Sequence, residues 1–357
     1  MTRIAAVHGA LAPHRHSQHT ITDMVARTCL PPGADRRVLD RLHRGARVTT
    51  RHTALPLDRY GGLEDFGEVN DAFIATAVPL GAEAVAGALD TAGLSPRDID
   101  LLIFTSVTGI AAPSVDARLV GRLGLRPDVR RVPVFGLGCV AGAAGIGRLH
   151  DYLLGRPDDV AVLLSVELCS LTFQRGDSST ANLVASALFG DGAAAVVACG
   201  SRRPATTGGP GRPGPVVVDT RSRLYPDTER AMGWDITGSG FRIVLDAGVP
   251  DLVRKNLAAD VDGFLADHGL TRADITAWVC HPGGPKVLEA VEEVLELPDG
   301  ALDFTWRSLA AVGNLSSSSV LHVLRDTLAE RPPPAGSAGL LLAMGPGFCA
   351  ELVLLRW

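Results

Sequence analysis

The clearest pattern of apolar and polar positions along the chain spans residues 80–106. Apolar residues first recur at helical spacing, a turn follows at Ser95 and Pro96, and a continuous apolar run at 101–104 predicts a buried strand. Residues 249–282 show the same order of helix, turn and strand, with the turn LTRADIT in place of LSPRDID. The chain therefore contains one helix–turn–strand unit twice.

The duplication continues into the next helix of each unit. Cys139 opens a helix rich in small residues that precedes an apolar strand, and Asn314 opens another helix that precedes an apolar strand. The separation between Leu94 and Leu270 in the two turns nearly equals the separation between Cys139 and Asn314. Each half thus places a polar or reactive residue at the start of the corresponding helix.

Strands that alternate with helices in both halves predict α/β layers with mostly parallel strand pairing. We expect an N-terminal half at residues 1–204 and a C-terminal half at residues 215–357. The Pro- and Gly-rich segment 201–215 is expected to join them as a surface loop. Two similar halves packed together would bring Cys139 and Asn314 to a shared centre.

Composition narrows the class of protein. The net charge of −5 provides no basic surface for nucleic acid, and there is no polybasic run for an anionic membrane. No run approaches the ~20 apolar residues of a spanning helix, and the N-terminus lacks a signal-peptide pattern. The six cysteines lack CxxC spacing, which argues against zinc and disulfides. We therefore expect a cytoplasmic protein without nucleic-acid partners or stable membrane association.

Four histidines near the N-terminus, His8, His14, His16 and His19, raise the question of a metal site. They lack the i, i+4 spacing of ligands on one helix face and have no acidic ligand nearby. We therefore expect a solvated polar arm and no metal.

Candidate chemistry centres on Cys139, which follows an apolar strand and two glycines at the start of a helix. The helix dipole and the free N–H groups at such a position lower a cysteine pKa and favour the thiolate. His281 stands at the end of an apolar strand before a Pro-Gly-Gly turn, and Asn314 opens the matching helix of the other half. Together the three residues suggest an enzyme that holds an acyl group on sulfur and makes a carbanion beside it.

Each of these residues also has a purely structural interpretation, as a buried cysteine, a core histidine and a helix N-cap. In addition, the segment from Gly136 to Ala141 matches the G-x-G-x-x-A fingerprint of dinucleotide-binding proteins. That fingerprint belongs in the first βαβ unit of a domain, with an acidic residue about 20 positions later. Here it begins after a third of the chain, and the next strand offers only the more distant Glu167, so nicotinamide binding is less favoured.

Six features in order resemble the motifs of type III polyketide synthases, the chalcone-synthase-like family. They are Cys139, FGDGAAA (189–195), GSGF (238–241), HPGGP (281–285), GNLSS (313–317) and GPGF (345–348). The resemblance covers the chain from residue 70 to the C-terminus, and the first 70 residues match loosely. It implies a thiolase-like α/β fold, with two duplicated βα halves packed as a layered α-β-α-β-α sandwich.

The resemblance also implies roles for single residues. Cys139 would be the nucleophile that carries the acyl group, and His281 and Asn314 would complete a catalytic triad. Phe189 and Phe241 would be aromatic gates between a coenzyme A tunnel and the reaction cavity. Further residues expected to line or shape this cavity are Val107, Ala112, Thr172, Ser316, Gly345, Pro346, Gly347 and Phe348.

The glycine-rich segment 345–348 has two interpretations. It joins two apolar strands, which by itself predicts an ordinary hairpin turn. Near a shared centre, it could equally supply a backbone N–H to an oxyanion.

The implied activity needs no metal and no cofactor besides coenzyme A thioester substrates. Cys139 would accept a starter from an acyl-CoA, and a malonyl-CoA-type extender would lose CO₂ to give an enolate stabilised by His281 and Asn314. Condensation and cyclisation would follow. The resemblance further implies a homodimer, with the loop around Ala111 and Ala112 near the subunit boundary.

Departures from relatives shape the expected product. Plant members carry a bulkier residue, often Met, at the position of Ala112, and bacterial tetrahydroxynaphthalene synthases carry a Cys at that of Val107. The segment 232–241 resembles bacterial synthases that make alkylpyrones or alkylresorcinols, so we expect an aliphatic acyl starter and such a product. Two alternatives are a ketoacyl synthase III type condensing enzyme that uses acyl carrier protein, and a non-catalytic thiolase-fold scaffold.

Overall fold

The computed structural model describes residues 1–203 and 214–357 of the chain. Most of the predicted linker at 201–215 therefore lies outside the described residues. The boundaries of the two predicted halves, at 204 and 215, stay a prediction.

Over the described residues, the main sheet has nine strands in the order β11-β12-β13-β8-β1-β7-β6-β4-β5. Its N-terminal part comprises β1 (Thr2–Leu11), β4 (Leu101–Thr105), β5 (Arg130–Val134), β6 (Val160–Leu168) and β7 (Asp191–Cys199). Its C-terminal part comprises β8 (Val216–Leu224), β11 (Ile275–Cys280), β12 (Ala338–Gly345) and β13 (Cys349–Arg356). The two parts meet where β1 pairs with β8 through Thr2 and Arg3.

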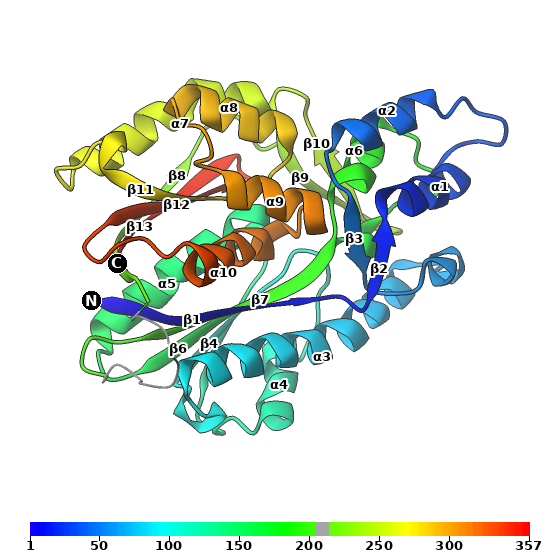
Figure 1. Cartoon of the computed structure of the whole chain (residues 1–357). Helices are drawn as coiled ribbons and strands as arrows, with labels where there is room; N and C mark the ends of the chain where they lie inside the picture. The colour runs from blue at the N-terminus through cyan, green and yellow to red at the C-terminus, as the bar shows by residue number, and fades with distance from the viewer. Residues whose placement is uncertain (204–213) are drawn as a thin grey trace.

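Helices cover and separate the two parts of the sheet (Figure 1). They are α3 (Phe66–Ala92), α4 (Val115–Leu123), α5 (Ala141–Gly155), α7 (Val249–Ala266), α8 (Pro285–Leu295), α9 (Asp303–Val312) and α10 (Ser319–Glu330). α3 and α4 lie on the N-terminal strands, and α7 and α8 pack in one apolar core with the C-terminal strands. Between them, α5 and α10 contact strands of both parts and form the central core. The predicted α-β-α-β-α layering is confirmed.

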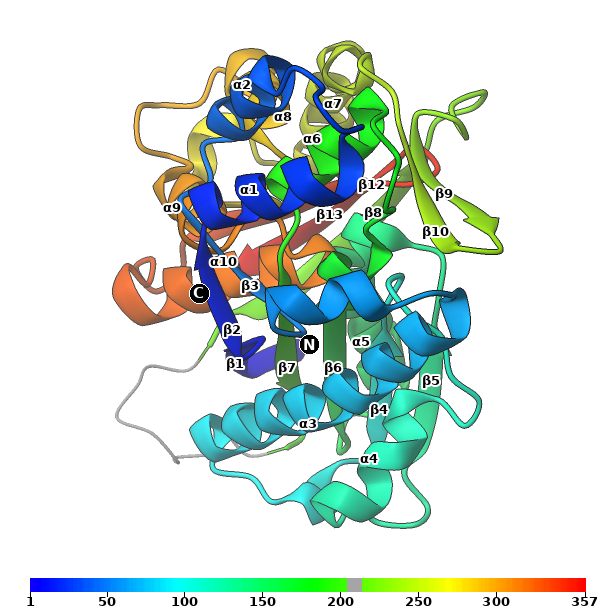
Figure 2. The same cartoon turned by 90° about the vertical axis from the view of Figure 1, so that its right-hand side faces the viewer.

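The remaining elements gather at the end of the molecule where α6 lies (Figure 1). They are β2 (His14–Ser17), α1 (Gln18–Cys29), α2 (Arg37–Gly45), β3 (Thr50–Thr53), α6 (Thr180–Leu188), β9 (Met232–Thr237) and β10 (Gly240–Leu245). Short 3-10 turns are η1 (Leu57–Gly62), η2 (Pro96–Asp98), η3 (Gly138–Val140), η4 (Cys169–Thr172), η5 (Arg272–Asp274) and η6 (Ser316–Ser318). The β9–β10 hairpin projects from one side of the molecule (Figure 2).

Both predicted helix–turn–strand units are present. α3 leads through η2 to β4, and α7 leads through η5 to β11. Each turn begins with a capping box, formed by Ser95 with Asp98 and by Thr271 with Asp274. The internal duplication read from the sequence is therefore also a duplication of local structure.

The prediction of mostly parallel pairing is wrong. β4 with β5 and β6, and β11 with β12, are parallel, but β7 is antiparallel to β6 and β1, and β13 is antiparallel to β12 and β8. The parallel pairs within each half are joined by helical crossovers. β13 instead follows β12 through the tight turn at 345–348, and such a turn joins antiparallel strands.

The expectation of a solvated N-terminal arm is wrong for three of its four histidines, whereas His19, in α1, is exposed. His8 lies in β1, whose alternating buried residues pack into the main sheet, and His14 and His16 lie in β2, which pairs with β3. The histidines interrupt the alternation of apolar and polar positions in this stretch, so the sequence pattern did not indicate its strands.

α3 is the one helix of the described residues that is long and apolar enough, by length and composition, to cross a membrane. It packs across β1, β6 and β7, and its buried side chains belong to the core of the N-terminal half (Figure 2). Its apolar character is therefore explained by its place in the core.

Candidate active site

Cys139 lies in η3, directly before α5. Gly138 has a φ of +56°, and a Cβ there would come within 2.6 Å of Pro346. A Cβ at Gly345 would lie 3.0 Å from the backbone nitrogen of Val140. Glycine at both positions allows the segment 345–348 to pack directly against the turn that carries the thiol.

Cys139, His281 and Asn314 line one cavity, although they come from η3, from the end of β11 and from the connection after α9. All three are buried, and Phe189 and Phe348 line the same cavity. The structure therefore brings together the three residues that the sequence singled out.

Asn314 is fixed by its backbone and by its side chain. Its N–H donates to the carbonyl of Leu188 at 2.8 Å, and its carbonyl accepts from the N–H of Gly190 at 2.9 Å. Its Oδ1 accepts from the N–H of Ser316 at 2.8 Å. The side-chain oxygen Oδ1 already accepts a hydrogen bond. The side-chain nitrogen Nδ2 is therefore the polar atom of this amide that remains to bind a ligand, as a donor.

Burial controls the protonation of Cys139 and His281. It raises the pKa of the Cys139 thiol to about 12, and it lowers the pKa of the His281 imidazole to about 3. Burial thus opposes the resting thiolate that the position at the helix start predicts, and the thiolate stays a prediction. The structure favours a neutral thiol beside a neutral imidazole.

The hydrogen bonds of the pair agree with neutral groups. The Cys139 thiol donates to the Ser316 hydroxyl, with 3.7 Å between the two heavy atoms. Neither ring nitrogen of His281 has a hydrogen-bond partner among the described residues. A buried imidazole with both nitrogens free can bond to a substrate without first breaking a bond to the protein.

Ser316 adopts a φ of +50°, which is unfavourable for a residue with a Cβ. The hydrogen bond from its N–H to Asn314 holds this conformation. The conformation places the Ser316 hydroxyl against the thiol, so the local strain contributes to the arrangement of the site.

Glu167 is a buried carboxyl that the sequence analysis did not assign to the site. It accepts hydrogen bonds from the N–H of Val107 and the hydroxyl of Thr108, both at 3.1 Å, and from the hydroxyl of Ser317. Burial raises its pKa to about 7. A single acidic residue in the otherwise apolar strand β6 was the available signal, because such a residue must be bonded where it is buried.

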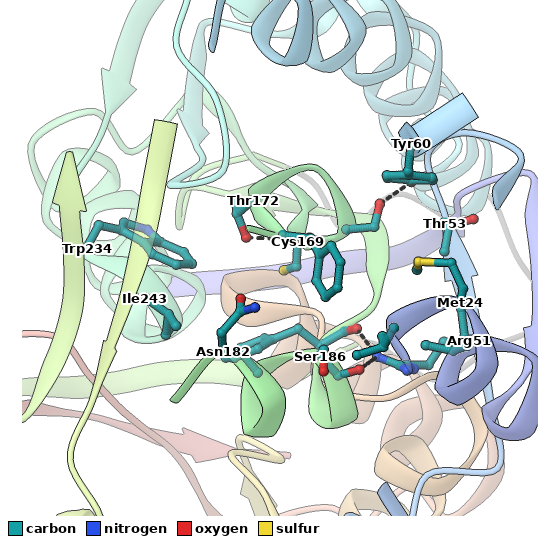
Figure 3. A pocket seen from close by; sticks show the side chains of 16 residues that line it. Met24, Arg51, Thr53, Tyr60, Cys169, Thr172, Asn182, Ser186, Trp234 and Ile243 are labelled. Atoms are coloured by element: carbon teal, nitrogen blue, oxygen red, sulfur yellow. Dashed lines mark hydrogen bonds between the residues drawn. The ribbon is translucent and has the colours of Figure 1, made fainter. Parts of the chain in front are cut away.

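The structure contains a second cavity (Figure 3). Phe189 is the residue that lines both cavities in the described part of the chain. The second cavity is lined by Ile21, Met24, Val25, Arg51, Thr53, Tyr60, Cys169, Ser170, Thr172, Phe173, Asn182, Ala185, Ser186, Trp234 and Ile243. Thr172, expected at the reaction cavity, is thus placed here, beside the thiol of Cys169, which the sequence analysis missed.

Phe241 differs from its expected position as a gate. Its ring packs against Phe66, Phe135 and Trp234, and it is absent from the described linings of both cavities. Trp234, its neighbour, faces the second cavity instead (Figure 3). A gating role for Phe241 stays a prediction.

Val107 and Ala112 are also absent from the described linings of the two cavities. The buried Val107 uses its N–H to bond Glu167, and Ala112 is exposed in the loop before α4. The expected roles of both residues at the reaction cavity stay predictions.

Among the described residues, no group of three or more His, Cys, Asp or Glu side chains is arranged to hold a metal ion.

Two family models match the chain. The model of chalcone and stilbene synthases, N-terminal domain, matches residues 4–202, and the corresponding C-terminal domain model matches residues 217–357. The match therefore includes the first 70 residues, which were expected to match only loosely.

Individual relatives agree with the family models. The 1,3,6,8-tetrahydroxynaphthalene synthase of Streptomyces peucetius subsp. caesius is 64% identical, covering 100% of this chain and 93% of the relative. An alpha-pyrone synthesis polyketide synthase-like protein of Mycobacterium tuberculosis is 33% identical, covering 99% of this chain and 91% of the relative. The crystal structure of 1,3,6,8-tetrahydroxynaphthalene synthase from Streptomyces coelicolor A3(2) matches with a TM-score of 0.91 and 30% identity, covering 99% of both chains.

Proposed function

Because the chain belongs to the chalcone and stilbene synthase family, and is a type III polyketide synthase acting by decarboxylative condensation, we propose that it makes a tetrahydroxynaphthalene from malonyl-CoA. The observation that carries this proposal is the 64% identity, over the whole chain, with a relative of that name. The alternative of an acyl carrier protein-dependent condensing enzyme is correspondingly less favoured.

The carbon skeleton of the product explains the choice of substrate. All ten carbons of a tetrahydroxynaphthalene are ring carbons, and ten carbons correspond to five two-carbon units. Five malonyl-CoA molecules yield one tetrahydroxynaphthalene, five CO₂, five coenzyme A and one water, and this equation balances in carbon, hydrogen and oxygen. Malonyl-CoA alone therefore suffices as starter and extender.

In this proposal, Cys139 carries the growing chain. Its sulfur attacks the thioester carbonyl of an incoming coenzyme A ester while its proton passes to His281. The proton then leaves with the coenzyme A thiolate, and a thioester on Cys139 remains. The free nitrogens of His281 and its burial in the same cavity support this role.

His281 and Asn314 also serve the decarboxylation. As a malonyl thioester loses CO₂, negative charge develops on its carbonyl oxygen. The N–H of the neutral His281 and the Nδ2 of Asn314 are the two donors that would stabilise it. The enolate carbon then attacks the Cys139 thioester, and the sulfur is released for the next step.

Ring closure needs space for the extended chain. Phe189 forms part of both linings, so a chain held at Cys139 that passes this residue would enter the second cavity. The mixture of apolar and hydroxyl side chains there suits a chain of alternating methylene and carbonyl groups.

The aliphatic starter and the alkylpyrone or alkylresorcinol product form a second candidate. The relative associated with alpha-pyrone synthesis supports it, as do apolar residues such as Ile21, Val25 and Ile243 in the second cavity. Each buried CH₂ of an alkyl tail would contribute about 0.8 kcal/mol. The lower identity of that relative places this candidate second.

Product analysis by liquid chromatography and mass spectrometry distinguishes the two candidates. Malonyl-CoA alone should give the naphthalene tetraol, with five CO₂ released per product and no acyl carrier protein in the assay. Parallel reactions would add hexanoyl-CoA or coumaroyl-CoA. A product that forms only when hexanoyl-CoA is supplied contradicts the tetraol proposal and supports the second candidate.

A homodimer is part of the proposal. β5 is one of the two edge strands of the sheet. Val132 in β5 and Phe135 directly after it are 44% and 47% exposed. Ile110, in the loop that leads to Ala112, is 46% exposed. An open strand edge flanked by exposed apolar side chains is a surface that a second copy can cover. Sedimentation velocity should show a dimer, and a stable active monomer would contradict this proposal.

We also propose a cytoplasmic location, with an acyl-CoA starter and a malonyl-CoA-type extender as the small-molecule partners. The net charge of −5 and the place of α3 in the core support a protein without nucleic-acid or stable membrane contact. Fractionation of cells that express the chain tests the location.

A further inference from the structure

Arg51 is a buried cation in the wall of the second cavity (Figure 3). It lies in β3, and its side chain belongs to a residue that is 3% exposed. The hydroxyl-bearing residues Thr53 and Ser186 line the same cavity. A guanidinium at this depth requires partners for its N–H groups.

Only part of the Arg51 guanidinium is used by the fold. Its Nη1 donates to the carbonyls of Ser186 and Phe189, at 2.6 and 2.8 Å. These carbonyls stand at the C-terminal end of α6, where a cation is favourable. Among the described residues, no acceptor bonds to Nε or Nη2, although both atoms are buried.

The two free nitrogens form one edge of the guanidinium, and that edge binds carboxylates elsewhere in this chain. Arg272 donates through Nε and Nη2 to the two oxygens of Asp262, each at 2.6 Å. Arg202 donates through the same two atoms to Asp158. Two parallel N–H groups match the two oxygens of a carboxylate, and Arg51 presents this edge without a protein partner.

Among the described residues, no carboxylate forms an ion pair with Arg51. Asp191 is the carboxyl that acts on it, but the oxygens of Asp191 accept from Ala54 and Ser170. Burial lowers the pKa of Arg51 to about 10, so the side chain is still a cation at neutral pH. A ligand anion would therefore supply both the missing acceptors and the missing charge.

We propose that the Nε–Nη2 edge of Arg51 binds the terminal carboxylate of a polyketide chain that was started with malonyl, and that Arg51 thereby selects the starter. The proposal rests on the proposed function, because it concerns the same substrate. An extender loses its carboxylate to form the enolate, whereas the starter can keep its own. That carboxylate remains at the far end of the chain, away from Cys139.

Phe189 lines both cavities, and its carbonyl is one of the two groups that Arg51 holds. In this proposal, a chain attached at Cys139 grows past Phe189. The far end of the chain then reaches the cavity that Arg51 lines. An alkyl starter would leave the two buried N–H groups of Arg51 without hydrogen bonds. Unpaired buried donors of this kind discriminate strongly against a substrate that lacks the acceptor.

Arg51→Gln tests the proposal, because the amide can still donate to the Ser186 and Phe189 carbonyls but carries no charge. With malonyl-CoA alone, we expect kcat/KM for product formation to fall about 10- to 100-fold, the scale of a lost charge-assisted hydrogen-bond pair. With hexanoyl-CoA as starter, we expect a change below about threefold. Arg51→Lys keeps the charge and should retain more of the malonyl-primed reaction than Arg51→Gln.

Arg202→Gln is the matched control, because it removes an equivalent guanidinium that is exposed and already paired with Asp158. It should leave both reactions unchanged. An equal loss of both reactions in Arg51→Gln and Arg51→Lys would overturn the proposal, since Arg51 would then only support the backbone at Phe189. Unchanged malonyl priming in Arg51→Gln would overturn it as well.

A comparison of glutaryl-CoA with hexanoyl-CoA separates this proposal from the identity of the product. Competition between the two starters in the presence of malonyl-CoA, followed by mass spectrometry of the extended chains, should favour chains started with glutaryl in the wild type and lose that preference in Arg51→Gln. This result would support the carboxylate site even if malonyl-CoA alone gave no naphthalene. A wild-type protein without preference for glutaryl would overturn the site even if the naphthalene formed. Because this last measurement uses the wild type, poor folding of a variant does not affect it.

Discussion

Burial sets the charge of the reactive groups at the scale of single residues. Cys139, His281 and Glu167 all lie in the interior, and burial shifts the pKa of each residue in the direction that favours its neutral form. The thiol is bonded to a hydroxyl, while the imidazole is bonded to nothing among the described residues. Burial therefore favours the neutral forms of these groups in the resting protein.

The alkylation rate of Cys139 should report this directly. With a thiol pKa near 12, the thiolate fraction rises as pH rises, so the rate with iodoacetamide should increase about tenfold per pH unit between pH 7 and pH 9. Cys139→Ala supplies the background from the other cysteines. A rate that is already constant across this range would indicate a resting thiolate–imidazolium pair and would contradict the neutral pair.

Cys139→Ala should abolish acyl loading and product while the protein remains folded. The substitution removes one sulfur atom whose hydrogen bond, to Ser316 at 3.7 Å, is weak. Intact-protein mass spectrometry after incubation with acyl-CoA measures the loading, and circular dichroism measures the folding. Normal product from this variant would exclude the covalent mechanism, and an unmodified wild type would indicate a non-catalytic scaffold.

His281→Ala and Asn314→Ala should each slow malonyl-CoA decarboxylation by roughly 10²–10³, the scale for loss of one oxyanion donor. Release of labelled CO₂ measures this step without dependence on ring closure. Val287→Ala changes a residue of the same cavity that offers no polar group, and it serves as the control. Unchanged CO₂ release in both variants would remove these residues from the enolate step.

The triad could be predicted from sequence because its signals are local. Glycines before Cys139, the Pro-Gly-Gly turn after His281 and the helix start after Asn314 are visible in a few neighbouring positions. Arg51 carries no such signal, and the only local signal for Glu167 is its place as the acidic residue of a mostly apolar strand. Their burial depends on how β3 packs against α9 and on the packing of β6 inside the sheet, which involve distant parts of the chain.

At the scale of elements, the central helices fix the relation between the two halves. α5 follows Cys139 and contacts η6, which follows Asn314, so the approach of these two elements sets the approach of the two functional residues. Gly142 permits it, because a Cβ there would lie 2.3 Å from the carbonyl oxygen of Ser317. Small residues in α5 thus determine the geometry of the site.

Gly142→Ala should therefore destabilise the protein and reduce activity. The overpacking should lower the free energy of unfolding by about 1–3 kcal/mol, in excess of any gain in helix propensity. Gly147→Ala in the same helix is the control, because its Cβ would meet Thr220 at an ordinary 3.4 Å. Urea denaturation measures both variants, and equal stability of the two would contradict the proposed contact.

The sequence predicted the repeated elements better than the unrepeated ones. Because the same order of helix, turn and strand occurs twice, each copy supports the prediction of the other. Both units, around η2 and η5, were therefore predicted. The direction of β7 and β13 was not found, because strand direction depends on the connection and not on the apolar pattern of the strand. The short elements from β2 to β3 have no second copy and were missed.

At the scale of the whole molecule, the residues of the β5 edge of the main sheet are mostly exposed within a single chain. β5 ends the sheet, and exposed apolar side chains lie on it and beside it. The layered fold could be predicted because the duplication implies two similar sheets around shared helices. The open edge could not, since the order of strands in the sheet is not visible in the sequence.

Phe135→Glu should weaken the proposed dimer, because a charge would have to be buried at the boundary. Sedimentation equilibrium should show a dissociation constant raised at least tenfold, which corresponds to about 1.4 kcal/mol. Val38→Glu changes a similarly exposed apolar residue on α2, away from β5, and is the control. A dimer of unchanged affinity in Phe135→Glu would place the interface elsewhere.

The position of Phe189 constrains how relatives of this enzyme can diverge. The backbone of Phe189 forms an isolated β-bridge with Asn314, and its carbonyl accepts a hydrogen bond from Arg51. Phe189 also lines both cavities. A substitution of Phe189 that changes the size of one cavity therefore also disturbs the surroundings of Cys139, His281 and Asn314. Changes in product size are therefore expected at residues that line the second cavity and not the first, such as Met24 and Trp234, where substitutions leave the first cavity unchanged.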